Sequence, residues 1–154
     1  MTENLPKLEE TPIGEYAFPG ALRDALVGAI LDGRKTSTTS LFAEFDFDKS
    51  KIEGVGTREA VVDSHGNIVC VTVNRKVEII PLKDVTLEHA INEGEGFTTL
   101  EEWRDAHVSF WRSQEFVDYM GEVDLSDDAL VVCHTFEIDE HYPVELLVPW
   151  EKNS

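Results

Sequence analysis

The segment Leu31-Asp32-Gly33-Arg34-Lys35-Thr36-Ser37-Thr38-Thr39-Ser40-Leu41 decides how this chain is interpreted. An apolar helical pattern ends at Gly33, two cations follow, and five consecutive hydroxyl residues come next. Thr and Ser tolerate an extended backbone, so we expect a strand over residues 36–43. Hydroxyls donate and accept hydrogen bonds, and a nearby cation can fix a negative group or activate a nucleophile. The segment therefore predicts a small polar site at a helix-to-strand junction.

The composition is that of one acidic globular domain. The chain has 154 residues, of which 42% are hydrophobic and 29% charged, enough for a single hydrophobic core. Its formal net charge is −18. Non-specific affinity for nucleic acids comes from Lys and Arg that neutralise phosphates, so this charge disfavours a charge-driven DNA or RNA binder. A local pocket for one nucleotide or nucleoside is still compatible with it.

Several classes of site and location are disfavoured by what the sequence lacks. No apolar run reaches membrane-spanning length and no secretory signal pattern is present, so we expect no membrane partner and a cytoplasmic location. Cys70 and Cys133 lie in apolar runs and are expected to be buried thiols. Without Cys-x-x-Cys or His-Glu-x-x-His spacing, we expect no metal site and no cofactor. The sequence is compatible with a homodimer.

The order of expected elements indicates an α+β fold. Residues 1–15 are interpreted as a flexible lead-in and residues 16–154 as the single domain. The expected elements are a helix over 20–32, the strand over 36–43, hairpin arms over 57–63 and 67–80, a helix over 84–92, a helix from Thr98 to about residue 120, and strands over 129–138 and 143–148. Strands and helices do not alternate strictly, which argues against a doubly wound sheet. We expect a strongly curved sheet or small mixed β-barrel with helices at its rim.

A second candidate group follows the expected helix over 84–92. Glu93 and Glu95 alternate with glycine, which allows a carboxylate to be held close to a ligand. The same pattern also fits an exposed helix end in an acidic chain. On the next helix, Trp103 and His107 share one face, where packing is favoured over base stacking or catalysis.

A third candidate group is cationic. Arg58, Arg75 and Lys76 lie on the expected hairpin and could form one wall of a pocket with Arg34. They could equally pair with surface carboxylates, which contributes little to stability. The sequence leaves both alternatives open.

Together these features resemble the ASCH domain family, which belongs to the PUA-like group of small β-barrels. The resemblance covers roughly residues 16–138 and rests on these residues: Leu31-x-Gly33-Arg34-Lys35-Thr36-x-Thr38-x-Ser40-Leu41, Phe18-Pro19, Val55-Gly56, Glu93-Gly94-Glu95-Gly96, Leu100-x-x-Trp103-Arg104-x-x-His107, and Leu130-Val131-Val132-Cys133-x-x-Phe136. It implies a PUA-like pseudo-barrel and a role in RNA or nucleoside metabolism.

The resemblance also implies catalytic residues. One branch of the family hydrolyses the acetyl amide of N4-acetylcytidine with a Lys, a Thr and a Glu, which match Lys35, Thr38 and Glu93 here. On this hypothesis Thr38 is the nucleophile and Lys35 the base, with its pKa lowered by burial and by Arg34; Glu93 is the acid or an anchor for the substrate amine. The chain departs from that branch in being longer and in having Ser40 where the branch has Arg.

The predicted function is therefore RNA- or nucleoside-directed, with an amidohydrolase acting on an N-acylated cytidine-type nucleoside as its most specific form. The expected partners are a nucleoside, a nucleotide, or a short or structured RNA. Expected substrate-binding residues are Arg34, Ser40, Arg58, Arg75, Glu95, Trp103 and His107. The alternatives are a non-catalytic RNA-binding PUA-like module, which requires a basic face, and a metal-independent ribonuclease that uses His107 or Lys35 for acid–base chemistry.

Overall fold

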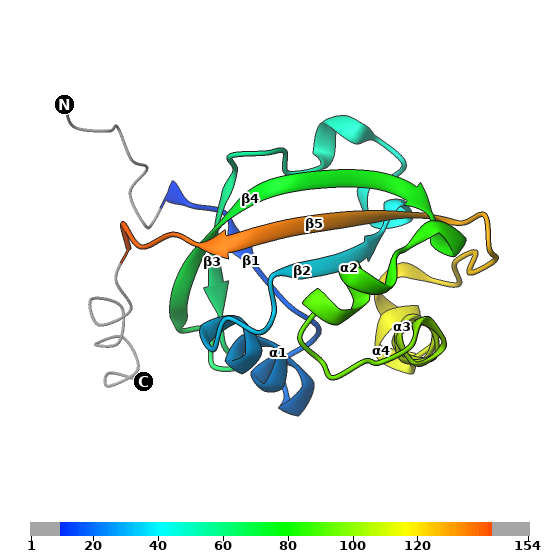
Figure 1. The fold of residues 1–154 in the computed structure, drawn as a ribbon, viewed down its shortest axis with the longest axis horizontal. Helices are drawn as coiled ribbons and strands as arrows, with labels where there is room; N and C mark the ends of the chain where they lie inside the picture. The colour runs from blue at the N-terminus through cyan, green and yellow to red at the C-terminus, as the bar shows by residue number, and fades with distance from the viewer. Residues whose placement is uncertain (1–9, 143–154) are drawn as a thin grey trace.

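One mixed five-stranded sheet forms the centre of the computed structural model, which describes residues 10–142 (Figure 1). Its strands are β1 (Ile13–Gly14), β2 (Ser37–Leu41), β3 (Arg58–Val62), β4 (Ile68–Pro81) and β5 (Leu130–Ile138). Their order is β1-β3-β4-β5-β2, and only the β1–β3 pair is parallel. Within residues 10–142 the sheet does not close, because β1 and β2 remain edge strands. The fold is α+β as expected, but the closed barrel is not observed.

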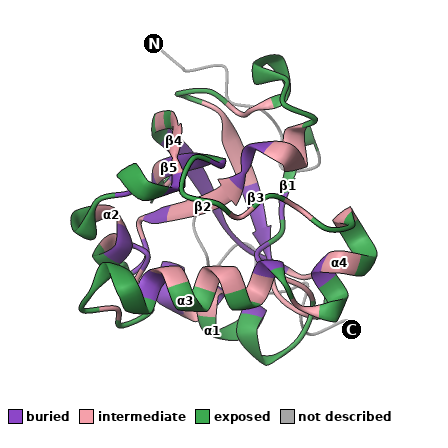
Figure 2. Ribbon diagram, turned by 90° about the vertical axis from the view of Figure 1, so that its right-hand side faces the viewer, coloured by how far each residue is buried: buried purple, intermediate pink, exposed green. Residues whose placement is uncertain are grey.

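Helices lie against this curved sheet, the first near one end and the others near the opposite end (Figure 1). They are α1 (Ala21–Leu31), α2 (Leu87–Asn92), α3 (Leu100–Trp111) and α4 (Gln114–Met120), with short 3-10 turns η2 (Phe42–Phe45), η3 (Lys49–Lys51) and η4 (Leu82–Asp84). Figure 2 shows buried residues concentrated on the strands and exposed residues on the outer turns of the helices. No helix among the described residues has the length and apolar character needed to cross a bilayer.

The expected helix from Thr98 to residue 120 is two helices. The capping box that starts α3 uses Thr99 and Glu102, so the helix begins just after the expected Thr98. The Ser113 hydroxyl then accepts a hydrogen bond from the Phe116 N–H and starts α4. A side chain that satisfies free N–H groups favours a new helix start over a continuous helix.

The two ends of the chain are described only in part. Residues 1–9 and the strand expected over 143–148 lie outside the described residues. Of the expected lead-in, Ile13–Gly14 form β1 and pair with Ala60–Val61 of β3. The flexibility of residues 1–15 stays a prediction.

Two hydrophobic clusters hold the helices against the sheet. The first joins α3 and α4 to the sheet through Leu41, Trp103, Trp111, Phe116, Val131 and Cys133. The second joins α1 to the sheet through Tyr16, Val27, Ile30, Val61, Cys70 and Phe136. Both cysteines are free and buried, as expected, and burial raises the pKa of each thiol to about 12. The gap between the two clusters is where the candidate site lies.

The junction between α2 and β2 is unusually tight. The Thr36 N–H donates to the Asn92 carbonyl oxygen at 2.7 Å. Gly94 has φ +72°, and a Cβ placed on it would lie 2.7 Å from backbone atoms of Arg34 and Lys35. Only glycine combines this left-handed conformation with such close backbone contact. The residues that follow α2 are therefore fixed against the cationic start of β2.

This junction gives a matched pair of glycine substitutions. Gly96 also has positive φ, but nothing lies within 4 Å of the position that a Cβ would take there. Gly96→Ala is therefore expected to reduce the free energy of unfolding by about 1–2 kcal/mol, and Gly94→Ala by about 3–5 kcal/mol because the backbone must also shift. Urea denaturation measures both. Equal losses for the two variants would show that the close contact at Gly94 is unimportant.

Candidate functional site

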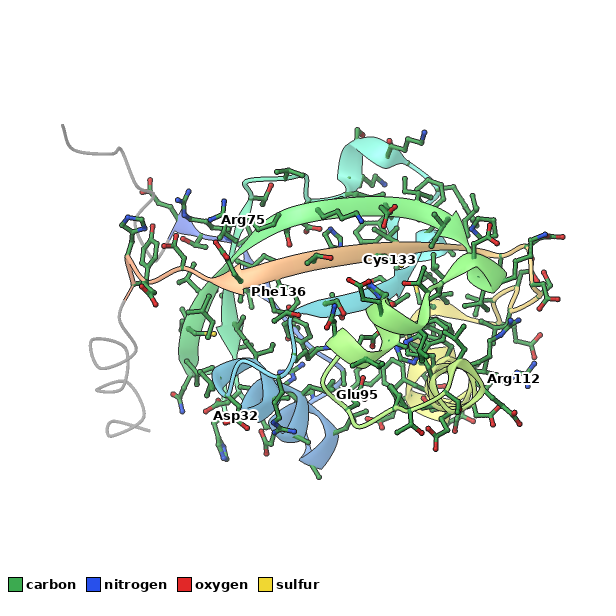
Figure 3. The ribbon with its side chains drawn as sticks, viewed as in Figure 1. Asp32, Arg75, Glu95, Arg112, Cys133 and Phe136 are labelled. Carbon is green, nitrogen blue, oxygen red and sulfur yellow. The ribbon has the colours of Figure 1, made fainter. Side chains whose placement is uncertain are left out.

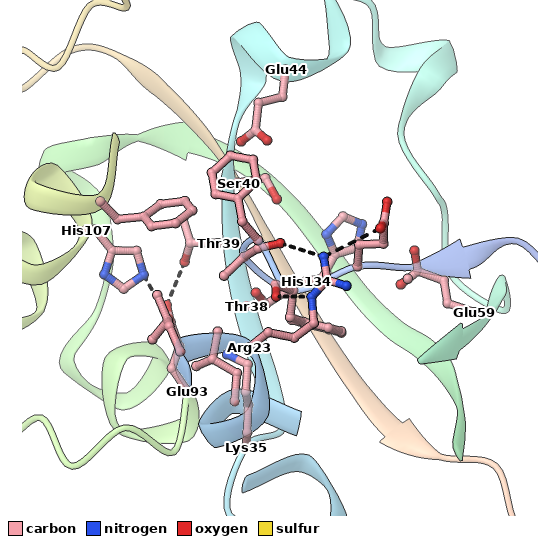
Figure 4. Close-up of a pocket in the computed structure, with 18 of the residues that line it drawn as sticks. Arg23, Lys35, Thr38, Thr39, Ser40, Glu44, Glu59, Glu93, His107 and His134 are labelled. Carbon is pink, nitrogen blue, oxygen red and sulfur yellow. Dashed lines mark hydrogen bonds and ion pairs between the residues drawn. The ribbon is translucent and has the colours of Figure 1, made fainter. Parts of the chain in front are cut away.

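A cavity of about 550 Å³ lies between the two edge strands of the open sheet (Figure 4). Ile13 and Gly14 of β1 line one side, and Thr38, Thr39 and Ser40 of β2 line the other. Small-ligand sites in proteins usually measure about 300–1,000 Å³, so the cavity has the size of a pocket for one small molecule. The site occupies the place where closure of the sheet would have sealed a barrel.

The three residues predicted to be catalytic all line this cavity. Lys35 lies just before β2, Thr38 lies within it, and Glu93 follows α2. Lys35 is 2% exposed and Glu93 1% exposed, whereas Thr38 is half-buried. Ser40, Glu95 and His107, which were predicted to bind substrate, line the same cavity. The contiguous cationic and hydroxyl segment and the distant Glu-Gly-Glu segment are thus brought together.

The Lys35 ammonium is held inside the protein. Its Nζ donates to the Ser37 carbonyl oxygen at 2.9 Å and lies 5.8 Å from the centre of the Tyr16 ring. Burial lowers the pKa of Lys35, and the charges of Glu93 and Glu95 oppose this shift only in part. The predicted contribution of Arg34 is not observed, because the Arg34 side chain is exposed and pairs with Asp32. Desolvation is therefore what favours a neutral amine here.

The Glu93 carboxylate is surrounded by donors. Oε2 accepts hydrogen bonds from the Thr39 hydroxyl and the Trp103 indole N–H, both at 2.7 Å. Oε1 lies 2.9 Å from Nε2 of His107. Burial works to raise the pKa of Glu93, but the hydrogen bond from His107, the nearby His89 ring, whose Nε2 lies 3.4 Å from Oε2, and the charges of His107 and Lys35 hold it well below its usual value. Glu93 is therefore ionised and is a poor proton donor.

His107 is the cationic partner of that carboxylate. Its Nδ1 lies 2.9 Å from the Trp103 carbonyl oxygen, and its Nε2 faces Glu93. A carbonyl and an ionised carboxylate only accept hydrogen bonds, so both ring nitrogens carry protons. Burial works to lower the pKa of His107, but the hydrogen bond to Glu93 and the Glu93 charge outweigh it and raise the pKa. Trp103, predicted to bind substrate, packs behind this pair and stacks on His107 with ring centres 4.3 Å apart.

A second chain of donors reaches Glu93 through β2. Nε2 of His89 lies 2.8 Å from the Thr39 hydroxyl, which itself donates to Glu93. The Thr39 oxygen must then accept from His89, which fixes the proton on Nε2 of that ring. The Ser37 hydroxyl donates to the His89 carbonyl oxygen at 2.9 Å. Ser37 and Thr39 are therefore occupied in holding the site together.

Glu95 lies at the exposed mouth of the cavity. Partial burial and the Glu93 charge raise its pKa, while the Lys35 charge opposes them. Among the described residues, one ligand atom each from Glu93, Glu95 and His107 lie within 4.8 Å of one another, close enough to hold a metal ion. Because Nε2 of His107 donates to Glu93, it could bind a metal only after losing its proton.

Four predicted binding residues lie outside the cavity lining: Trp103, which packs behind His107, and three arginines. Each arginine pairs with a carboxylate: Arg34 with Asp32, Arg58 with Asp139, and Arg75 with Glu137. Lys76 likewise pairs with Glu78. Figure 3 shows Asp32 after α1 and Arg75 on β4, so these cations are spread over different elements. The structure does not gather them into one cationic wall.

The side of the cavity opposite Glu93 carries polar residues that were not identified from the sequence. Figure 4 shows Glu59 and His134 on that side, and Glu53 and Asn74 lie beside them. Burial and the charge of Glu53 raise the pKa of Glu59 to about 7. The His134 ring donates from Nε2 to the Glu53 carbonyl oxygen at 2.9 Å. Burial lowers the pKa of His134, so its ring is neutral.

Arg23 was also missed, although it shapes the cavity. It is a buried residue of α1 whose guanidinium donates to the carbonyl oxygens of Tyr16 at 3.1 Å and Ala17 at 3.0 Å. The Ala17 backbone has φ +57°. A charged residue on an otherwise apolar helix face was the only available signal, and it does not reveal which backbone segment Arg23 holds.

Comparison with known proteins identifies the family of this chain. A family model described as the ASCH domain matches residues 15–140, so the chain belongs to the ASCH domain family. The match confirms the predicted resemblance over roughly residues 16–138. No curated protein matches the chain.

Two crystal structures share this fold. One is of a protein from Enterococcus faecalis, with a TM-score of 0.74 and 24% identity over 88% of this chain and 79% of that one. The other is of an ASCH domain from Lactobacillus crispatus, with a TM-score of 0.72 and 22% identity over 86% of this chain and 81% of that one. At these identities the likeness concerns the fold alone.

The raised pKa of Glu59 predicts a pH-dependent stability. The folded protein keeps a proton on Glu59 between the usual value of 4.5 and about 7, so this group makes the fold less stable as the pH rises through that range. Glu59→Gln removes the effect. The free energy of unfolding of Glu59→Gln, measured relative to wild type, should therefore increase by about 2–3 kcal/mol between pH 4.5 and pH 8.

Urea denaturation at several pH values measures that difference. Glu78→Gln, at an exposed position on β4 outside the cavity, is the matched control and should not reproduce the trend. A difference for Glu59→Gln that stays constant with pH would contradict the burial of this carboxyl.

The protonated state of His107 can be measured directly. Its raised pKa means that the charged ring stabilises the fold fully below the unfolded value of about 6.5, and that this contribution is lost as the pH rises through the folded value. We expect an NMR titration midpoint for His107 above 6.5, falling by at least about one unit in Glu93→Gln. A midpoint that does not respond to Glu93→Gln would refute the ion pair.

Proposed function

We propose that the chain hydrolyses the N-acyl amide of a small cytidine-type nucleoside. The observation that carries the proposal is the meeting of a buried amine, a hydroxyl and a buried carboxylate at one cavity, from Lys35, Thr38 and Glu93. A pocket of about 550 Å³ suits a small substrate. Such a substrate is compatible with the charge of −18, because it needs only local recognition.

Thr38 is the best-placed nucleophile among the five consecutive hydroxyl residues. Ser37 and Thr39 use their hydroxyls to bind His89 and Glu93. Within residues 10–142 the Thr38 hydroxyl makes no hydrogen bond, and it lines the cavity. A hydroxyl without a protein partner is available to substrate and to a base.

Lys35 supplies the base in this proposal. Its neutral amine takes the Thr38 proton while Oγ forms a bond to the acyl carbon, and the resulting ammonium returns a proton to the nitrogen as the C–N bond breaks. Water then attacks the acyl-threonine ester with Lys35 again as base, which releases the carboxylic acid and restores Thr38. Burial, which lowers the pKa of Lys35, supports this role.

Glu93 serves as an anchor and not as an acid. Its carboxylate has about four acceptor positions. Thr39, Trp103 and His107 occupy three of these. The remaining position on Oε1 can accept an N–H of the substrate base. The low pKa of Glu93 argues against the acid role that the sequence allowed.

The free edge of β2 is a source of oxyanion stabilisation. The Thr36 carbonyl accepts from the Phe136 N–H at 2.9 Å. Because hydrogen-bonded pairs alternate along an antiparallel ladder, Thr38 pairs with His134, and the Thr39 N–H points to the unpaired edge. In this proposal that N–H, next to the nucleophile, stabilises the negative oxygen of the tetrahedral intermediate.

Binding or cleavage of RNA is the alternative, and fewer observations support it. An RNA-binding module needs a basic surface, whereas Arg34, Arg58 and Arg75 each pair with a carboxylate. A ribonuclease that used His107 would first have to separate its Nε2 from Glu93. Binding and cleavage of short RNAs, measured with and without a chelator in parallel with the nucleoside assay, test both alternatives.

Hydrolysis of N4-acetylcytidine, followed by mass spectrometry, tests the proposal. Thr38→Ala should lower kcat/KM by at least about 100-fold because it removes the nucleophile. Thr36→Ala is the matched control, since that hydroxyl lies two residues away and does not line the cavity. Wild-type protein without activity, or a fully active Thr38→Ala variant, would exclude this function.

A further inference from the structure

We propose that Glu59, Asn74 and His134 form a subsite for the vicinal 2′,3′-hydroxyls of a ribose, at the opposite side of the cavity from Glu93 (Figure 4). The inference rests on the proposed nucleoside substrate and adds which part of that substrate is recognised. It also predicts that nucleosides with a phosphate on one of these two hydroxyls bind weakly.

The buried side-chain amide of Asn74 is the feature that indicates a ligand at this position. Asn74 is 3% exposed and lines the cavity, yet its Nδ2 has no hydrogen-bond partner among the described residues. A buried N–H without a partner costs about 1–3 kcal/mol, so such groups are rare unless something else satisfies them. A ligand oxygen in the cavity would remove this cost.

The strand register places the three side chains on the same face of the sheet. Glu59 is opposite Thr72, two residues before Asn74 on β4. Asn74 is opposite Phe136, two residues after His134 on β5. Residues two apart on a strand share a face, so a polar row crosses from β3 to β5. His134 is in turn opposite Thr38, which connects this row to the proposed nucleophile.

A bulge in β4 supports a functional role for this row. The pairing of β4 with β5 shifts between Asn74 and Lys76, which leaves Arg75 without a partner in the register. Bulges redirect side chains and are common beside functional sites. Here the bulge directly follows Asn74, whose amide has no partner in the described part of the chain.

The donors and acceptors of this row match a diol. Asn74 Nδ2 can donate to a hydroxyl oxygen. His134 donates through Nε2 to the Glu53 carbonyl, so the Nδ1 of its neutral ring is an acceptor. The Glu59 carboxyl offers further acceptor positions. Two neighbouring hydroxyls can donate to His134 and Glu59 while one accepts from Asn74, which an apolar group cannot do.

The charge of this side of the cavity excludes phosphate. Glu53 and Glu59 both line it, and the two buried basic side chains of the cavity are used elsewhere: Lys35 donates to the Ser37 carbonyl oxygen, and Arg23 donates to the carbonyl oxygens of Tyr16 and Ala17. The effect of Glu53 on the pKa of Glu59 shows that carboxylates already act on one another here. A phosphate on the 2′- or 3′-oxygen would add a further negative charge, which is unfavourable at short range.

Calorimetric binding of unreactive nucleosides tests the subsite separately from hydrolysis. Cytidine should bind wild-type protein about 10-fold more tightly than 2′,3′-dideoxycytidine, the effect of losing one or two hydrogen bonds. Asn74→Leu should weaken cytidine about 10-fold and leave 2′,3′-dideoxycytidine unchanged. Cytidine 3′-monophosphate should bind at least 10-fold more weakly than cytidine.

The controls separate this subsite from stability and from catalysis. Thermal melting confirms that Asn74→Leu is folded, and Glu78→Gln, outside the cavity, should bind both nucleosides like wild type. Wild-type protein that binds cytidine with this preference but does not hydrolyse N4-acetylcytidine would leave the subsite standing while the proposed function fails. The subsite is refuted if cytidine does not bind, if it binds no more tightly than its dideoxy analogue, or if Asn74→Leu weakens both equally.

Discussion

The buried Glu93 carboxylate is the constraint on which the rest of this structure depends. An ionised carboxylate inside a protein is tolerated only when donors and positive charge surround it. Its donors come from β2 through Thr39 and from α3 through Trp103 and His107. The close backbone contact at Gly94 fixes the same segment to the start of β2. One charge therefore determines how two helices and an edge strand meet.

This arrangement separates the cavity into two chemically different sides. The Glu93 side holds the buried Lys35 amine and the protonated His107 ring beside the carboxylate. The opposite side holds carboxyl groups and the Asn74 amide, whose Nδ2 has no hydrogen-bond partner within residues 10–142. Low dielectric strengthens electrostatic differences in such a space, so a ligand with distinct polar ends has only one favourable orientation. Orientation of this kind is what a reaction at one end of a small molecule requires.

The sequence predicted the parts of this structure that local pattern determines. The α1 helix, the hairpin of β3 and β4, and the segment containing Lys35 and Thr38 all follow from apolar spacing and residue type. The placement of Glu93 followed from family resemblance. In contrast, Asn74 and His134 reach the cavity only through strand register and a bulge, which composition does not encode. Arg34 was predicted to be a site residue because it precedes Lys35, but its side chain is exposed and pairs with Asp32.

The open seam between β1 and β2 has a consequence for ligand size. One wall of the opening is the stretch that includes Tyr16 and Ala17, and the Arg23 guanidinium holds it by two backbone carbonyls. Neither contact belongs to the packing of α3 and α4 against the sheet. The next residue, Phe18, packs against Phe110 of α3 and Tyr119 of α4, so the width of the entrance depends both on Arg23 and on the larger hydrophobic cluster. Substitutions in this short stretch would therefore change the size of the largest molecule that can enter the cavity, while the charged groups inside keep their geometry.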